Sequence, residues 1–110
     1  MEIQTRKEKV AVVVSVKGRV DAVTAPEFEK NVIDWISMGE KTFVLNLGEL
    51  DYISSAGLRS ILALAKKLKE REGKIVVAGL KGPVEEVFKI SGFQSIFKIF
   101  DSEESALREI

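Results

Sequence analysis

A buried strand passes directly into a helix within TFVLNLGELDYISSAGLRSIL, residues 42 to 62. The run from Thr42 to Leu47 is almost continuously apolar, which is typical of a strand covered on both faces of a sheet. The helix predicted after the serines starts near Ala56 and stops at Gly73, because apolar residues recur there at helical spacing. This stripe consists of Leu58, Ile61, Leu62, Ala65 and Leu68. A buried strand followed by an amphipathic helix is a building unit of parallel α/β domains.

Two short β-type runs open the chain, upstream of this unit. They extend from Glu2 to Arg6 and from Val10 to Val16, about a polar turn at residues 7–9, and Gly18 ends the second run. Runs of this length around a polar turn predict a hairpin.

Helix signals follow in TAPEFEKNVIDWISMG, residues 24–39. Thr24 with Glu27 fits a capping box, Pro26 lies in the first turn, and Gly39 is a C-terminal stop. One face of this helix is apolar, so we expect it to lie on the sheet. That face carries Phe28, Val32, Trp35 and Ile36.

The C-terminal half continues the alternation of strands and helices. KIVVAGL, residues 74–80, predicts another buried strand, and GPVEEVFKISG, residues 82–92, predicts a short helix with Pro83 near its start. SIFKIF, residues 95–100, predicts a fifth strand, and a closing helix begins at Asp101 or Ser102.

The predicted order is therefore β-β-α-β-α-β-α-β-α, in one domain that spans residues 1–110. Strands that alternate with helices of this length pair mostly in parallel, through right-handed crossovers. We expect an α/β domain with a central mixed, mostly parallel sheet of four to five strands and about four helices. Function in such sheets gathers where strand C-termini meet helix N-termini.

The composition excludes several classes of function. Lys plus Arg and Asp plus Glu both number 17, so no basic field argues for a nucleic-acid partner. The chain has no His and no Cys, which removes His-based triads, thiol chemistry, disulfides and the usual zinc sites. We expect no signal peptide, because residues 1–9 are charged, and no apolar run approaches the roughly 20 residues of a membrane helix. We expect a cytoplasmic, non-enzymatic protein with no metal and no cofactor.

Ser54 and Ser55 stand where the second helix begins, and the residues alone leave their role open. Serine before a helix is usually an N-terminal cap, worth about 1 kcal/mol. A single cap does not require two serines, however, and Ala56 and Gly57 leave the first turn nearly bare. A phosphoryl group here would meet the positive end of the helix dipole and the N–H groups of Ala56, Gly57 and Leu58.

Several segments resemble the STAS domain, specifically that of bacterial anti-sigma factor antagonists. Asp51–Leu58 is similar to the family signature of an apolar residue, Asp or Ser, the phosphorylated Ser or Thr, a small residue, Gly and an apolar residue. GRVDAVTA, residues 18–25, resembles the earlier Gly-x-hydrophobic-Asp-x-x-Thr-Ala segment. Residues 87–93 and 102–107 fit the C-terminal part, so the resemblance runs from about Val10 to the end.

The resemblance implies a phosphorylation switch. Unmodified antagonists of this family bind an anti-sigma factor that is also a serine kinase, which releases the sigma factor. The kinase then phosphorylates the antagonist, which dissociates, and a serine phosphatase resets it. By position the acceptor is Ser55; many members have Asp where this chain has Ser54, which makes Ser54 the less favoured alternative acceptor. The implied partner contacts are Asp21, Thr24, Ser54, Ala56, Gly57, Leu58 and Arg59.

The sequence supports other classes of function less well. A non-catalytic accessory or scaffold role, stressosome-like or transporter-associated, is the alternative; scaffold members usually carry a further N-terminal domain, and we expect a monomer of one domain. A serine hydrolase lacks a general base and a Gly-x-Ser-x-Gly elbow, and a nucleotide-binding module lacks a Gly-x-x-x-x-Gly-Lys loop.

Four single residues have ordinary structural interpretations beside functional ones. By itself, Asp21 is typical of a solvated turn, Asn46 of a hydrogen-bonded strand residue, Trp35 of the core and Arg59 of the surface. Both Asp21 and Ser54 follow β-type runs that we expect to be neighbours in the sheet. The sequence therefore predicts that Asp21 lies within a few ångströms of the Ser54–Ser55 loop.

Overall fold

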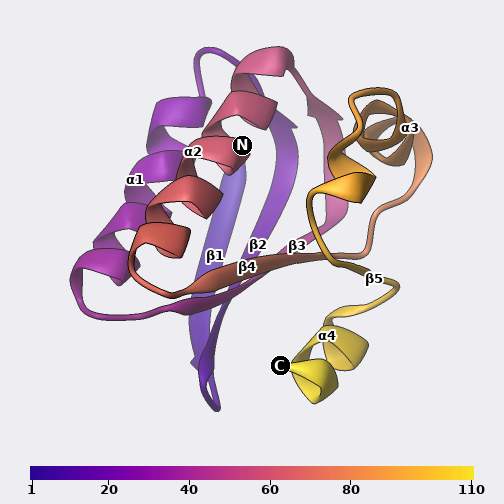
Figure 1. Ribbon diagram of the computed structural model, residues 1–110. Coiled ribbons are helices and arrows are strands. Elements are labelled where there is room, and N and C mark those ends of the chain that lie inside the picture. Colours follow the sequence, from indigo (N-terminus) through magenta and orange to yellow (C-terminus); the bar gives the residue numbers. More distant parts are fainter.

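One mixed sheet organises the computed structural model, which describes all residues from Met1 to Ile110 (Figure 1). The strands lie in the order β1-β2-β3-β4-β5, with β1 antiparallel to β2 and the other neighbours parallel. The elements are β1 (Glu2–Glu8), β2 (Ala11–Val20), α1 (Ala25–Ser37), β3 (Thr42–Ile53), α2 (Ser55–Glu70), β4 (Lys74–Ala78), α3 (Gly82–Ile90), the 3₁₀ turn η1 (Phe93–Ser95), β5 (Ile99–Phe100) and α4 (Glu103–Glu109). This confirms the predicted order and the mostly parallel pairing.

The sheet separates two apolar clusters of unequal size. Alternate residues of β2 point to opposite faces, so that Val12 and Val14 join the larger cluster while Val13 joins the smaller one. The larger cluster has 22 buried residues and includes the inner faces of α1, α2 and α3. The smaller has six buried residues and is closed by Ala106 of α4. Figure 1 shows α1 and α2 side by side over the sheet, with the short α4 apart from them.

Several strand boundaries differ from the prediction. β3 continues from Leu47 to Ile53 because it keeps pairing with β2, past two register irregularities, as far as Val20. The fifth strand is only Ile99–Phe100 rather than residues 95–100. The preceding segment forms η1 and an irregular stretch instead, which brings the rings of Phe93 and Phe97 into the large cluster.

The predicted capping box of Thr24 and Glu27 is wrong. The Thr24 side chain makes no capping bond to α1; its hydroxyl accepts from the Asp21 N–H at 2.9 Å and lies 3.0 Å from the Arg19 carbonyl oxygen. Pro26 does lie in the first turn, and Gly39 follows the end of α1 in the left-handed region. Ser102, not Asp101, caps the closing helix.

The buried face of α2 also differs from the predicted stripe. Leu64 is buried where Leu62 was expected, and Leu62 is 37 % exposed. Leu58 and Ala65 are partly buried against the large cluster. Trp35 of α1 is packed against the same cluster, as expected.

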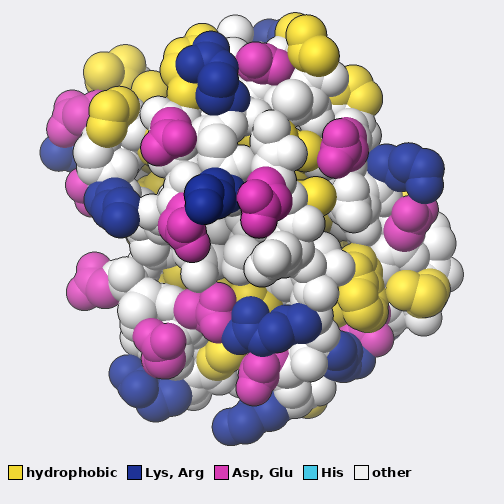
Figure 2. Space-filling view, turned by 180° about the vertical axis from the view of Figure 1, so that it is seen from behind, with side chains coloured by type: hydrophobic (Ala, Val, Ile, Leu, Met, Phe, Trp, Pro, Cys, Tyr) yellow, Lys and Arg dark blue, Asp and Glu magenta, His cyan; other side chains and the backbone are white.

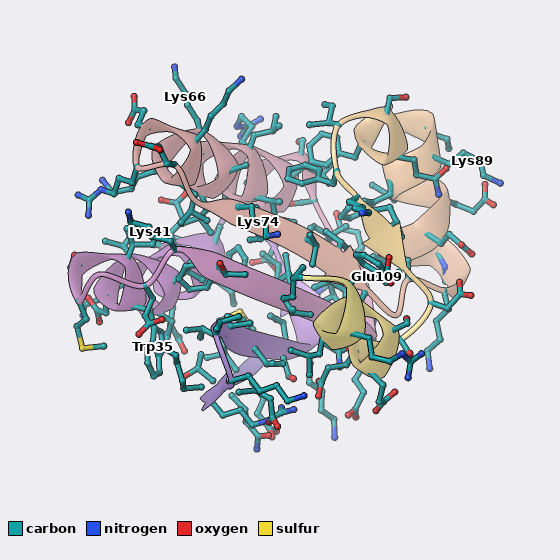
Figure 3. The ribbon with its side chains drawn as sticks, turned by 60° about the horizontal axis from the view of Figure 1, so that its bottom comes forward. Trp35, Lys41, Lys66, Lys74, Lys89 and Glu109 are labelled. Atoms are coloured by element: carbon teal, nitrogen blue, oxygen red, sulfur yellow. The ribbon has the colours of Figure 1, made fainter.

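The two ends of the parallel strands are different surfaces. Lys41 and Lys74 mark the edge where β3 and β4 start, and Figure 3 shows both there. The opposite edge holds the ends of β2 and β3 and the start of α2.

The helices of the structure are too short or too polar to span a membrane.

Candidate functional site

The ends of β2 and β3 meet at the start of α2. The last pair in their register is Val20 with Ile53, and the Ser54 N–H donates to the Val20 carbonyl at 2.9 Å. Asp21 follows directly after Val20, so the turn that it begins lies beside Ser54. The predicted proximity of Asp21 to the serine pair is thus confirmed, over more than thirty residues of sequence.

The two serines have different roles at the start of α2. Ser54 is the N-cap, with extended backbone (φ −92°, ψ 174°), and its Oγ accepts from the Gly57 N–H at 3.3 Å. Ser55 is the first helical residue, and its side chain is exposed and makes no hydrogen bond within the chain. The helix therefore begins one residue before the predicted Ala56, and the cap is Ser54 alone.

The first turn of α2 offers fewer unpaired donors than the sequence suggested. Gly57 donates to the Ser54 side chain, and Leu58 donates to the Ser54 carbonyl at 3.0 Å. The N–H groups of Ser55 and Ala56 come first in the helix, where no intrahelical acceptor exists. Two donors at the positive end of a 16-residue helix thus remain beside the Ser55 hydroxyl.

Gly57 allows this close approach of helix and strands. It is buried, and a Cβ at this position would lie 2.7 Å from Ile53 Cγ1 and 2.9 Å from Val20 Cγ1. Any side chain here would push α2 away from the strand ends. Gly57 is therefore a packing residue beneath the surface, and its role as a partner contact stays a prediction.

The other predicted contacts vary in exposure. Arg59 is exposed and forms no ion pair within the chain, whereas Ala56 and Leu58 are partly buried. Thr24 is partly buried and its hydroxyl is used within the turn. Arg59 and Ser55 are thus the most accessible of the predicted set.

The turn from Asp21 to Thr24 is held by its own side chains. One Asp21 carboxylate oxygen accepts from the Val23 N–H at 3.0 Å and from the Thr24 N–H at 3.1 Å. The Thr24 backbone bond, with smaller contributions from Val23 and from the Arg19 charge, holds the pKa of Asp21 below its ordinary value. Asp21 therefore presents a fixed negative charge at neutral pH.

Arg19 and Tyr52 lie at this site, although no local sequence signal marks either residue. They are register partners at the ends of β2 and β3, and the guanidinium carbon of Arg19 lies 4.1 Å from the centre of the Tyr52 ring. Arg19 Nε is 3.8 Å from the free carboxylate oxygen of Asp21. Only a prediction of the register between β2 and β3 would have found this stack.

The chemistry available at this edge is that of recognition. The edge where β2 and β3 end carries a solvent-facing hydroxyl at a helix start, an ionised carboxylate and a stacked guanidinium. No group of three or more Asp or Glu side chains in the chain is arranged to hold a metal ion. The helix dipole and the first two N–H groups favour a negative charge at this helix start.

The amino-acid sequence of the chain matches a known domain family and a known bacterial protein. A family model described as the STAS domain matches residues 2–106. A protein of Bordetella bronchiseptica described as a candidate anti-sigma factor antagonist, BtrV, is 47 % identical over 90 residues, which cover 82 % of this chain and 78 % of that protein.

Solved structures show the same fold. An anti-sigma factor antagonist from Mycobacterium paratuberculosis superposes with a TM-score of 0.90 at 24 % identity, covering 99 % of this chain and 92 % of the other. The phosphorylated form of the Bacillus cell fate determinant SpoIIAA superposes with a TM-score of 0.78 at 20 % identity, covering 98 % of both chains.

Proposed function

This chain belongs to the STAS domain family, and on that premise we propose that it is an anti-sigma factor antagonist controlled by phosphorylation of Ser55. In its unmodified form it binds an anti-sigma factor that is also a serine kinase, and the bound sigma factor is released. Phosphorylation by that kinase ends the complex, and a serine phosphatase restores the unmodified form. The resemblance to BtrV, which is described as a candidate for the same role, supports the class of partner.

One observation carries the choice of Ser55. Its hydroxyl is exposed and uncommitted, whereas the Ser54 hydroxyl is partly buried and accepts the capping bond from Gly57. A kinase must bring ATP in line with a free hydroxyl, and phosphorylating Ser54 would disrupt the cap of α2. Phosphorylated Ser55 instead stays at the first helical position, where a phosphate is favourable.

Charge explains how the switch would act without unfolding the domain. A phosphoserine adds about −1.5 to −2 charges at pH 7. The start of α2 tolerates this charge, but Asp21 is already negative on the same surface. A partner that covers Ser55 must bury the phosphate beside Asp21, which costs several kcal/mol unless the partner supplies a cation. A cost of about 3 kcal/mol lowers affinity more than a hundredfold.

Kinase labelling tests this proposal. Purified serine-kinase anti-sigma factors of the source organism are incubated with ATP and with the wild-type chain, Ser54→Ala, Ser55→Ala or Ser55→Asp, and the products are mapped by mass spectrometry. We expect label at Ser55 in the wild type and in Ser54→Ala, and none in Ser55→Ala.

Calorimetric titration of the same variants tests the switch. Ser55→Ala should bind the kinase persistently in the presence of ATP, and Ser55→Asp should bind more weakly by a factor of about 100 while melting close to wild type. Full labelling of Ser55→Ala, or unchanged binding by the protein phosphorylated at Ser55, would leave the serine pair as a helix start without a regulatory role.

A further inference from the structure

Exposed apolar residues share with Ser55 the edge where β2 and β3 end. Val23 is 86 % exposed in the turn after β2, and Tyr52 is 40 % exposed at the end of β3. Figure 2 shows hydrophobic side chains along the upper rim of the molecule, the side on which Figure 1 places the loop from β2 to α1. Below that rim, the same view shows Lys, Arg, Asp and Glu side chains spread over the face, with a further group of hydrophobic side chains at the right. Single exposed apolar residues are ordinary, but a pair that borders a candidate regulatory serine is not.

Local contacts hold the backbone at both positions. The Val23 N–H and the Thr24 N–H bond to the Asp21 carboxylate. Tyr52 lies within β3, and the Arg19 guanidinium lies over its ring. A backbone that is already ordered loses little conformational entropy when a partner covers it, which favours binding.

Arg19 adds charge complementarity to this rim. Its only ion pair is with Asp21 at 3.8 Å, too long for a hydrogen bond, and its guanidinium donates no hydrogen bond within the chain. The N–H donors of the Arg19 guanidinium are therefore available to a carboxylate of a partner. Arginine and tyrosine are also among the residues that most often dominate the energy of protein interfaces.

We propose that Val23, Tyr52 and Arg19 form the docking rim of this chain for its kinase partner, which presents an apolar pocket for Val23 and a carboxylate for Arg19. This inference rests on the proposed function and adds the chemistry of the partner surface. It also adds a second reason for release, because a carboxylate that binds Arg19 is repelled by a phosphate on the neighbouring Ser55. Phosphorylation of Ser55 would thus lower the affinity of the kinase for the docking rim.

Binding and kinase assays with matched variants test the rim. Val23→Ser and Arg19→Ala are compared with Val10→Ser and Lys41→Ala, whose side chains are exposed at the opposite end of the sheet. Each variant is titrated against the purified serine-kinase anti-sigma factors that bind the wild type. We expect Val23→Ser and Arg19→Ala each to weaken binding about tenfold, and the two controls to stay within about twofold.

Kinetics separate docking from the phosphoacceptor. The rim variants should raise the KM of the kinase for this chain and leave kcat and the position of labelling unchanged, since Ser55 itself is intact. Arg19→Ala should also bind with a weaker dependence on salt than the wild type.

Two results would overturn the proposal in distinguishable ways. If the rim variants bind like their controls while Ser55→Asp still loses binding, the docking rim is wrong and the proposed function stands. If none of the kinases binds or labels the wild type, the proposed function fails and the rim fails with it.

Discussion

The two faces of the sheet are closed by different means. On one face, α1, α2 and α3 bury a cluster of 22 residues that is almost wholly apolar. On the other, the seven-residue α4 buries a cluster of six and is held by polar contacts as well. A short helix has too little apolar area to fix its position by packing alone. The small face is therefore closed by apolar packing of Ala106 together with ionic and hydrogen-bonded contacts of α4.

Side chains from β1 and β3 hold α4 through an ion pair and a hydrogen bond to Glu103. Arg6 of β1 pairs with Glu103 at the start of α4, and the Asn46 amide of β3 donates to the same carboxylate at 3.0 Å. Asn46 in turn accepts from the Gly48 N–H at 2.9 Å, so the expected hydrogen-bonded role of Asn46 is confirmed. The bond from Arg6, and then that from Asn46, hold the pKa of Glu103 below its ordinary value.

The largest difference between the faces should appear when each core is truncated. Phe43 and Val44 are adjacent and fully buried, but they belong to opposite clusters. We expect Phe43→Ala to lower the free energy of unfolding by about 3–5 kcal/mol, and Val44→Ala by about 2 kcal/mol, because fewer atoms lose contact. Urea denaturation of both variants measures the losses. Equal losses would show that the α4 face contributes as much packing energy as the face with three helices.

The most crowded point of the larger face is the start of α2. We expect Gly57→Ala to destabilise the chain by about 1–3 kcal/mol, because the new Cβ meets Ile53 and Val20 at less than contact distance. Helix propensity alone predicts the opposite sign, a gain of up to about 1 kcal/mol. Thermal and urea denaturation distinguish the two. A stabilised Gly57→Ala variant would mean that α2 can move off the strand ends freely.

The contribution of the Glu103 carboxylate to the free energy of unfolding should depend on pH. At pH 7, Glu103→Gln should cost about 1 kcal/mol, a modest value because Arg6 is half exposed. Since the folded pKa of Glu103 lies below 4.5, this stabilisation is complete above that pH and is lost as the pH falls through the folded pKa.

The difference between the wild type and Glu103→Gln should therefore close below about pH 4.5. Unfolding free energies measured from pH 3 to 7 check this, with Glu104→Gln as a control in the same helical turn. A gap that is constant with pH would assign the role of Glu103 to shape rather than charge.

We expect the smallest changes in the free energy of unfolding from substitutions of Ser54 and Ser55. Ser54→Ala removes the cap of α2 and should cost about 0.5–1 kcal/mol, since its bond to Gly57 is long. Ser55→Ala removes an exposed hydroxyl without a partner and should change stability by less than about 0.5 kcal/mol. Precise urea midpoints separate the two variants. A larger loss for Ser55→Ala would reverse the roles assigned to the two serines.

The order of strands and helices and their mostly parallel pairing follow from the sequence alone. Apolar spacing, helix stops and the run from Thr42 to Leu47 are local signals, so neighbouring residues are enough to predict which elements form and in what order. The sequence also determined the segment that carries the candidate site, because the ends of two neighbouring strands meet at one edge.

Which serine caps α2 and which is free depends on contacts between distant segments of the chain. Either serine fits the local pattern, but the Val20 carbonyl takes the Ser54 N–H and so fixes the residue at which β3 ends and α2 begins. The same holds for the stack of Arg19 on Tyr52 and for the pair of Arg6 with Glu103, which are separated by 97 positions. Such contacts depend on register and packing between distant segments, and no spacing along the chain encodes them.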